Sequence, residues 1–307
     1  MKTIALLSTS LAATLVALLP GTPAQALDDR TWVSFTGSGT ACTRVTPCNN
    51  FLDAHNATAP GGEINCLDSG PFTFSPVFFT KSITIDCAGA GAASAIFFRV
   101  DGAGIVVRIR NLTFNGALSG GSPTIDFVNG AALFVENCAI SGLRSGPGIL
   151  FRPSGSAKLV VSNSTITDNG TGILIDPGAS GFALVTVQNV TLQGNTGAGL
   201  VATGNGGGGV HVSVRDSLST LNGNHGFAAV TNVSGVVMKL ERVEASFNNS
   251  FGVFGNGPTA IAIGNSNIIG NGTGIAQFNG SQIFSHGNNS FFDNGTDGTP
   301  NGIIALK

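Results

Sequence analysis

Charged side chains and tyrosine are scarce in this chain. Only 10% of its 307 residues are Asp, Glu, Lys or Arg, the formal net charge is −2, and no run of basic residues occurs. Because a protein that binds nucleic acid needs Lys and Arg to neutralise phosphates, we expect no nucleic-acid partner. The chain has no Tyr and a single Trp, Trp32. A groove that binds sugars by aromatic stacking would therefore have to use phenylalanine.

Long hydrophobic runs are absent after the first residues. Lys2 gives a short positive end, an apolar stretch continues to Pro20, and Ala24-Gln25-Ala26 has the small-x-small form of a cleavage site. This order predicts a signal peptide over residues 1–26, cleaved after Ala26, and a secreted or periplasmic protein. The alternative is an uncleaved anchor. We expect no membrane span after cleavage, because no later stretch is long and apolar enough.

The chain has five cysteines and lacks any Cys-x-x-Cys or Cys/His group, so we predict no zinc or other metal site. Cys42 and Cys48 are close enough in sequence to form a disulfide around a small loop. Cys66 and Cys87 end equivalent strands, and neighbouring strands lie within disulfide reach. They form either a second bridge or two buried thiols. Cys138 is expected to be a small core residue.

Asparagines recur at a fixed interval of 26 residues, each inside a similar phrase. The phrases are VVRIRNLTF (106–114), ALFVENCAI (132–140), KLVVSNSTI (158–166) and LVTVQNVTL (184–192), and they contain Asn111, Asn137, Asn163 and Asn189. Later copies place Asp216, Arg242 and Asn265 at the same point. Self-similarity at this period indicates a solenoid, in which each repeat is one coil.

Each phrase alternates apolar and other residues, as in Leu133 and Val135, which predicts a strand with one buried face. The asparagine follows on the inward parity. We therefore expect an inward ladder of stacked amides that bond one another, formed by Asn111, Asn137, Asn163, Asn189 and Asn265. Asp216 and Arg242 interrupt this column and are expected to pair with each other.

A second phrase, such as NGTGI (169–173) or NGNHGF (222–227), follows each ladder position. Its Asn and Gly suit the positive-φ positions of tight corners, and its closing Gly precedes a second short strand. The sequence therefore predicts an all-β, single-stranded parallel β-helix solenoid.

These repeats, together with the segment RTWVSFTGSGTACTRVTPCNNFLDAHNATAPGGEINCLD (30–68), resemble the secreted right-handed parallel β-helix proteins of the pectate-lyase-like superfamily. The resemblance covers the whole mature chain and implies about ten right-handed coils. We expect an N-terminal cap over residues 27–61, with a first strand, a disulfide and a short helix around Asn50–Ala57. The β-helix then occupies residues 62–307 and ends in a C-terminal cap containing Phe291 and Phe292.

The resemblance does not fix an activity, because this fold supports lyases, hydrolases, epimerases, adhesins and non-enzymes. In the pectate-lyase branch, clustered carboxylates bind calcium and an Arg or Lys abstracts a proton. We find no matching carboxylate cluster, so no cofactor is predicted, and calcium is expected only if the protein is a lyase.

Charged residues on the outward parity of the first strand are the best candidates for a binding site. Arg108 and Arg110 lie one coil from Glu136, and Arg215 lies one coil from Glu241. Basic side chains beside a carboxylate suit an acidic sugar. The alternative is that these residues form weak cross-coil ion pairs on a solvated sheet.

The outward parity of the second strand is unusually apolar. An exposed stripe of this length is typical of an interaction surface, unless a loop or the tail covers it. It consists of Val128, Leu150, Leu174, Val201, Ala228, Phe254 and Phe278.

No catalytic apparatus is identified, so we expect a secreted β-helix with a surface or periplasmic binding or structural role, whose partner is a glycan or an envelope component. One alternative is a polysaccharide lyase or epimerase acting on an acidic glycan. The other is an assembly module that self-associates through the apolar stripe.

Overall fold

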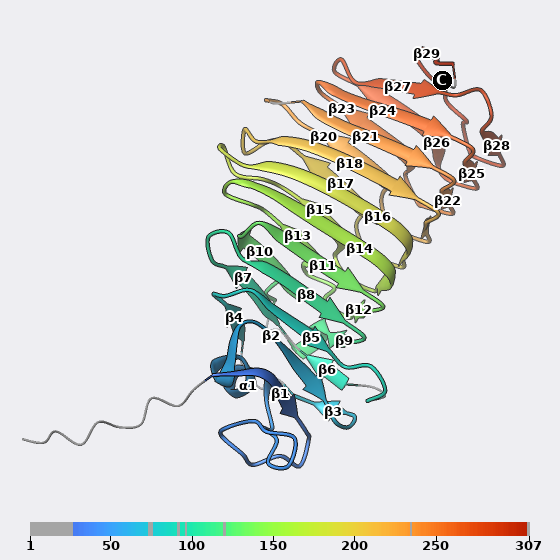
Figure 1. Ribbon diagram of the computed structural model, residues 1–307. Helices are drawn as coiled ribbons and strands as arrows, with labels where there is room; N and C mark the ends of the chain where they lie inside the picture. Colours follow the sequence, from blue (N-terminus) through green and yellow to red (C-terminus); the bar gives the residue numbers. More distant parts are fainter. Residues whose placement is uncertain are drawn as a thin grey trace, which may run out of the picture.

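The computed structural model describes residues 27–72, 76–90, 93–95, 97–118, 121–233 and 235–305. The predicted signal peptide lies outside the described residues. The described chain winds into a right-handed parallel β-helix of about ten coils, as the sequence predicts (Figure 1).

One continuous sheet bends into two faces, which we call the front sheet and the side sheet. The front sheet contains β1 (Asp28–Val33), β2 (Thr58–Cys66), β5 (Ile83–Asp86), β8 (Val106–Arg110), β11 (Ala132–Glu136), β18 (Gly209–Arg215), β21 (Val236–Glu241), β24 (Thr259–Gly264), β27 (Gln282–Ser285) and β29 (Gly302–Ile303). The side sheet contains β3 (Gly70–Pro71), β6 (Ala93–Ala95), β9 (Thr113–Asn115), β12 (Ala139–Ser141), β19 (Leu218–Thr220), β22 (Glu244–Ser246), β25 (Asn267–Ile269) and β28 (Ser290–Phe292). β14 (Ser156–Thr167) and β16 (Phe182–Gln193) run through both faces.

A separate sheet closes each coil, and we call it the back sheet. It contains β4 (Val77–Phe79), β7 (Phe98–Asp101), β10 (Ile125–Asn129), β13 (Pro147–Phe151), β15 (Thr171–Ile175), β17 (Leu200–Thr203), β20 (Phe227–Val230), β23 (Phe251–Asn256) and β26 (Thr273–Phe278). All of these strands pair in parallel, coil upon coil, and a short 3-10 turn, η1 (Gly116–Leu118), follows β9.

The inward side chains form columns of Val, Ile, Leu and Phe, all buried. The alternation predicted for each phrase is therefore correct. Val107, Leu133, Leu159, Val185 and Val212, for example, are at most 4% exposed and lie in register on successive coils. Burying such a column along the whole rod supplies the main driving force for folding.

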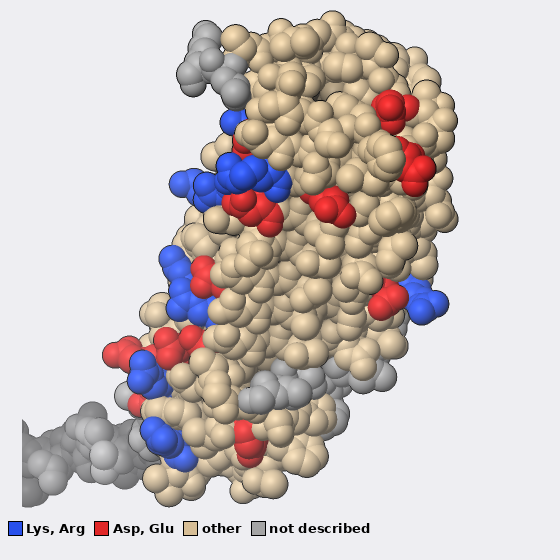
Figure 2. All heavy atoms as spheres, turned by 90° about the vertical axis from the view of Figure 1, so that its right-hand side faces the viewer, with Lys and Arg blue, Asp and Glu red and all other residues tan. Residues whose placement is uncertain are grey.

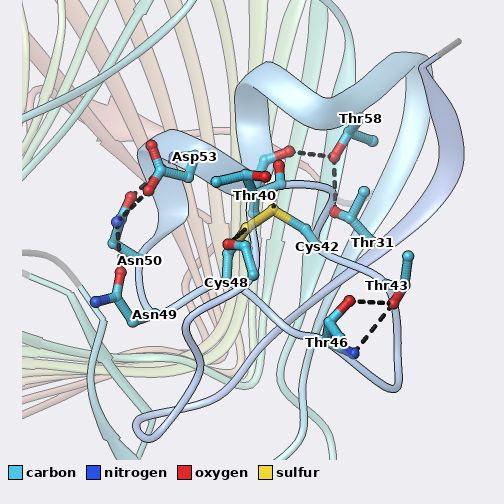
Figure 3. Close-up of a disulfide and its surroundings, with 12 residues drawn as sticks. Thr31, Thr40, Cys42, Thr43, Thr46, Cys48, Asn49, Asn50, Asp53 and Thr58 are labelled. Atoms are coloured by element: carbon cyan, nitrogen blue, oxygen red, sulfur yellow. Dashed lines mark hydrogen bonds between the residues drawn. A yellow bond between two sulfur atoms is a disulfide. The ribbon is translucent and has the colours of Figure 1, made fainter. Parts of the chain in front are cut away.

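The N-terminal end is covered by α1 (Phe51–Ala57), close to the helix predicted from sequence. Asn50 caps this helix, because its side chain accepts a hydrogen bond from the Asp53 amide at 2.8 Å. A Cys42–Cys48 disulfide closes the loop beside it, as Figure 3 shows. The buried Thr31 and Thr58 hydroxyls bond each other at 2.8 Å and tie β1 to β2.

The second pair of cysteines also forms a bridge. Cys66 is the last residue of β2 and Cys87 directly follows β5 on the next coil, with their Cα atoms 4.7 Å apart. Of the two alternatives left by the sequence, the disulfide is the one present. Cys138 is a free, buried thiol, and burial raises its pKa to about 12. It is the core residue that the sequence predicts.

At the C-terminal end, β29 pairs with β27 and extends the front sheet by one strand. Phe291 packs partly buried against the core, as expected for a cap. Phe292 is 69% exposed, so it does not cover the end of the core as predicted.

The predicted inward ladder is wrong in its orientation. Its five asparagines, Asn111, Asn137, Asn163, Asn189 and Asn265, all have φ between 49° and 57° and are exposed or half-buried. A residue in the left-handed region interrupts the strand alternation, so the residue after it points inward instead. Cys138, Ser164 and Val190 take those inward positions. The five asparagines thus form an outer row at the bend between the front and side sheets.

Asp216 and Arg242, which interrupt this outer row, form a salt bridge, as the sequence predicts. Arg242 donates from Nε to Asp216 Oδ1 at 2.7 Å across one coil spacing. This hydrogen bond lowers the pKa of Asp216.

A buried asparagine ladder does exist, one corner further along each coil. It consists of Asn169, Asn195, Asn222, Asn248 and Asn271, all at most 2% exposed. The Oδ1 atom of Asn222 accepts from the backbone amide of Asn195 at 3.1 Å and from its side chain at 2.9 Å. Asn222 in turn donates from Nδ2 to Asn248 Oδ1 at 2.9 Å. The amides thus satisfy one another along the axis of the rod.

The closing glycines of the second phrase are needed for close packing between coils and not for the positive φ predicted for these corners. Gly226 and Gly252 do not have positive φ. They are needed for space, because a Cβ atom on Gly226 would lie 2.6 Å from the Gly252 carbonyl oxygen. Only a residue without a side chain allows neighbouring coils to approach this closely.

Candidate functional site

Arg108, Arg110 and Glu136 lie together on the outer surface of the front sheet. Arg110 donates from Nε to Glu136 Oε2 at 2.7 Å across one coil. The Arg108 guanidinium lies over the Phe134 ring at 4.5 Å from its centre. Arg108 forms no ion pair with any residue that the structure describes, so its charge remains available to a ligand.

Arg215 and Glu241 face outward on the same sheet, two and three coils beyond β14, and are in register on β18 and β21. They do not bond each other. Arg215 donates to Gln188 Oε1 at 2.6 Å on the opposite side. Glu241 lies 3.8 Å from both Lys239 and Arg242. The sequence-derived candidates therefore occupy one face but form two separate groups.

Beside these groups lies a hollow of about 400 Å³, which we call the front hollow. It spans β14, β16, β18 and β21, and its apolar surface includes Val160, Leu184 and Val237. Lys158 and Lys239 lie at its opposite ends. Three coil spacings separate these lysines, roughly 14 Å at about 4.8 Å per coil. The candidates from sequence included neither lysine, and only Lys158 lies on a strand without a carboxylate.

The front sheet is also biased in charge. From β8 to β21, five outward side chains are cations and two are carboxylates: Arg108, Arg110, Lys158, Arg215 and Lys239 against Glu136 and Glu241. The whole chain has a formal net charge of −2. From β8 to β21, the front sheet therefore has a small excess of positive charge on a slightly acidic protein, which favours an anionic ligand.

The apolar stripe lies on the outer surface of the back sheet, but in two rows. Leu150, Leu174, Val201, Ala228 and Phe254 are in register on consecutive coils. Val128 and Phe278 lie two residues further along their strands than this row. The residues in register with the row are Asp126, which pairs with Leu150, and Ala276, which pairs with Phe254. Most of the stripe is half-buried, and Phe278 is 52% exposed.

A histidine stacks within the stripe. The His225 ring lies 4.5 Å from the Phe254 ring and 5.2 Å from the Phe251 ring, both nearly parallel to it. Its Nδ1 atom is buried and has no hydrogen-bond partner in the described part of the chain. Desolvation lowers the pKa of His225 to about 4, so the ring is neutral in the folded protein at pH 7.

This histidine predicts a loss of stability in acid. Between pH 6.5, the ordinary pKa, and pH 4, the unfolded chain binds a proton at His225 that the folded chain does not. Stability therefore falls as the pH drops through this window. His225→Phe keeps the stacking and removes the proton. Urea unfolding at pH 7 and pH 4.5 should show a smaller loss for this variant than for the parent protein. Equal losses in both proteins would contradict this assignment.

The back sheet also holds an ion network that the sequence reasoning missed. The Asp126 side chain is 3% exposed and accepts two hydrogen bonds from Arg152, at 2.9 and 2.8 Å. Arg99 lies 3.6 Å from the same carboxylate. The signal was present in the sequence, because Asp126 and Arg152 are separated by 26 residues, the repeat period. Two guanidiniums satisfy this carboxylate, so its role is structural.

Asp176 follows on the next coil and is less well satisfied. Its Oδ1 atom is buried and has no partner among the described residues. Burial raises the pKa of Asp176, and the nearby Arg152 partly offsets this.

Among the residues that the structure describes, no three His, Cys, Asp or Glu side chains are grouped so that they could hold a metal ion. The described residues also include no helix with the length and hydropathy of a membrane span.

Residues 84–239 match the protein family described as the right handed beta helix region. The chain belongs to this right-handed β-helix family. The crystal structure of pectate lyase Pel9A is similar to this β-helix, with a TM-score of 0.59 over 85% of this chain and 75% of that chain. The two sequences are 17% identical, so the likeness concerns the fold. No curated protein matches the sequence. Both disulfides of this β-helix are typical of proteins that fold outside the reducing cytosol.

Proposed function

We propose that this β-helix is a secreted protein that binds an acidic polysaccharide along its front sheet. The observation that carries the proposal is the front hollow, where Lys158 and Lys239 lie at the two ends of an apolar floor. Sugar rings present C–H surfaces and, in uronates, carboxylates. The apolar floor suits the C–H surfaces, and the lysines suit the carboxylates.

The charges around the front hollow extend this binding surface. Arg108 lies two coils before Lys158, and Arg215 lies on the strand before Lys239. A linear polyanion lying across the coils would meet a cation at several points. Because each contact is made at an exposed surface, we expect binding to weaken as salt is added.

The test is a change of both lysines to glutamine, Lys158→Gln with Lys239→Gln. We expect this double variant to bind a galacturonate or other uronate oligomer at least about tenfold more weakly, which corresponds to about 1.4 kcal/mol. Calorimetric titration measures the change. The matched control is Arg44→Gln with Arg144→Gln, which removes the same net charge from exposed positions outside the front sheet.

Equal affinities of the double variant and the parent protein would refute a front-sheet site. The same mixtures, followed by ultraviolet absorbance with and without calcium, report any unsaturated product. Product formation would show that the bound polymer is also cleaved by a lyase reaction.

The back sheet supports self-association as a second candidate function. The observation that favours it is the exposure of Phe278 beside the half-buried Phe251 and Phe254. Light scattering at increasing concentration tests it, and a particle that stays monomeric would reject it.

A further inference from the structure

A second hollow lies at the bend between the front and side sheets, and we call it the bend hollow. Its volume is about 620 Å³, within the range of ligand sites in proteins. It spans four consecutive coils, from the end of β5 to β14. None of the residues that line it is charged: Cys87, Ala88, Gly89, Asn111, Leu112, Thr113, Asn137, Cys138, Ala139, Asn163 and Thr165.

Most charged residues of this protein lie away from the bend hollow, although the Asp86 carboxylate borders it and accepts hydrogen bonds from the Ala88 amide and from Asn111 Nδ2. Figure 2 looks at the side sheet, where most Lys and Arg side chains lie along the left-hand edge, toward the front sheet, together with Asp and Glu, and some basic atoms lie at the right-hand edge. Further along the same bend, a neighbouring hollow of about 400 Å³ includes Asp216, Arg242 and Glu244. The uncharged stretch of the bend therefore ends before β19, and the bend hollow lies within it.

The amides at the bend hollow keep hydrogen-bonding capacity for a ligand. Asn137 makes no side-chain hydrogen bond to any residue in the described ranges. Asn163 accepts from Asn189 Nδ2 at 2.7 Å through Oδ1, and its own Nδ2 has no partner in the same part of the chain. Asn111 donates from Nδ2 to Asp86, and its Oδ1 atom accepts no hydrogen bond from any residue that the structure describes. Successive coils thus present amide donors and acceptors at intervals of about 4.8 Å.

A parallel row of side chains forms the other side of the bend hollow. Thr113, Ala139 and Thr165 are in register on successive coils. The two hydroxyls can donate and accept, and the methyl group of Ala139 forms an apolar patch between them. Amides on one side, hydroxyls on the other and a small apolar floor match the surface of a sugar, which has hydroxyls around its edge and C–H groups on its faces.

We propose that the bend hollow binds a neutral, hydroxyl-rich oligosaccharide, at a site separate from the positive front sheet. An anionic ligand would find no cation there. A strongly apolar ligand would leave the exposed amides without partners, at a cost in affinity.

Two kinds of variant test this site. Ala139→Gln places a longer side chain in the bend hollow without changing the turn. Asn137→Gly combined with Asn163→Gly removes two amides, while glycine keeps the positive φ of 53° and 50° at these positions. The control is Asn279→Gly, which has a φ of 52° and lies outside the bend. Thermal unfolding of each variant confirms that it is folded.

The probes are neutral hexasaccharides of glucose, mannose and galactose, with hexagalacturonate as the charged comparison. The affinity of each is measured by calorimetric titration. We expect at least one neutral hexasaccharide to bind. Its affinity should fall at least tenfold in Ala139→Gln and in the double glycine variant, and stay within twofold in Asn279→Gly and in the front-sheet lysine variant.

Absence of binding by every neutral hexasaccharide would overturn the inference, as would unchanged affinity in folded Ala139→Gln. If only hexagalacturonate binds and the lysine variant abolishes it, the bend hollow is not a site while the proposed function of the front sheet stands.

Discussion

Replacing Gly226 by alanine is expected to lower the free energy of unfolding by at least about 3 kcal/mol, or to prevent folding. The new methyl group would lie 2.6 Å from the Gly252 carbonyl oxygen and 2.9 Å from the Asn248 side-chain nitrogen. Both atoms belong to the next coil, so the coils would have to separate locally. Urea unfolding followed by circular dichroism measures the change.

Gly155→Ala is the matched control, because a Cβ atom at Gly155 meets nothing within 4 Å. This variant should be neutral or stabilised by up to about 1 kcal/mol, since alanine restricts the unfolded chain. A Gly226→Ala protein as stable as Gly155→Ala would show that the coils are not in close contact at this corner.

Replacing Asn222 by alanine should cost about 3 kcal/mol. The change leaves the buried backbone amide of Asn195 without its acceptor at 3.1 Å and removes the side-chain link to Asn248. A buried donor without a partner costs about 1–3 kcal/mol, and the lost side-chain volume adds a cavity. The same urea measurement applies.

The control for Asn222 comes from the outer row. Asn137→Gly keeps the turn and loses no side-chain hydrogen bond to any described residue, so its cost should stay below about 1 kcal/mol. If Asn137→Gly were the more damaging of the two changes, the outer row and not the buried ladder would stabilise the stack.

The fold could be predicted from the sequence because its signals repeat. Alternation such as Leu133 and Val135 defines one buried face, and the period of 26 residues sets the register between coils. Cys66 and Cys87 are 21 residues apart but lie at equivalent strand ends of successive coils, which brings them within disulfide distance. In a solenoid each coil contacts mainly its neighbours, so local patterns determine most of the structure.

The orientation of the outer asparagines could not be predicted from the alternation alone. A single residue with positive φ, such as Asn137, shifts the parity of everything after it, and asparagine is common both in such turns and in buried ladders. Because asparagine is common in both settings, the sequence predicts corners at Asn169 and Asn222 but does not show that these residues form the buried ladder.

The candidate site was predicted only in part. Arg108 and Arg215 face outward on one sheet, as their parity indicates. The front hollow depends on how four strands curve together, which a linear pattern does not contain. Asp126 and Arg152 lie 26 residues apart, at the repeat spacing, but the prediction for the second strand rested on its apolar residues and not on its charges.

The most direct test of the proposed function is lysine acetylation in the presence of a uronate polymer, read by mass spectrometry at each lysine. Lys158 and Lys239 should be protected together when the polymer is bound. Lys81, whose Nζ bonds the Thr58 carbonyl outside the front hollow, should react at an unchanged rate. If the polymer binds while Lys158 and Lys239 are acetylated as fast as in its absence, the acidic-glycan site is not on the front sheet.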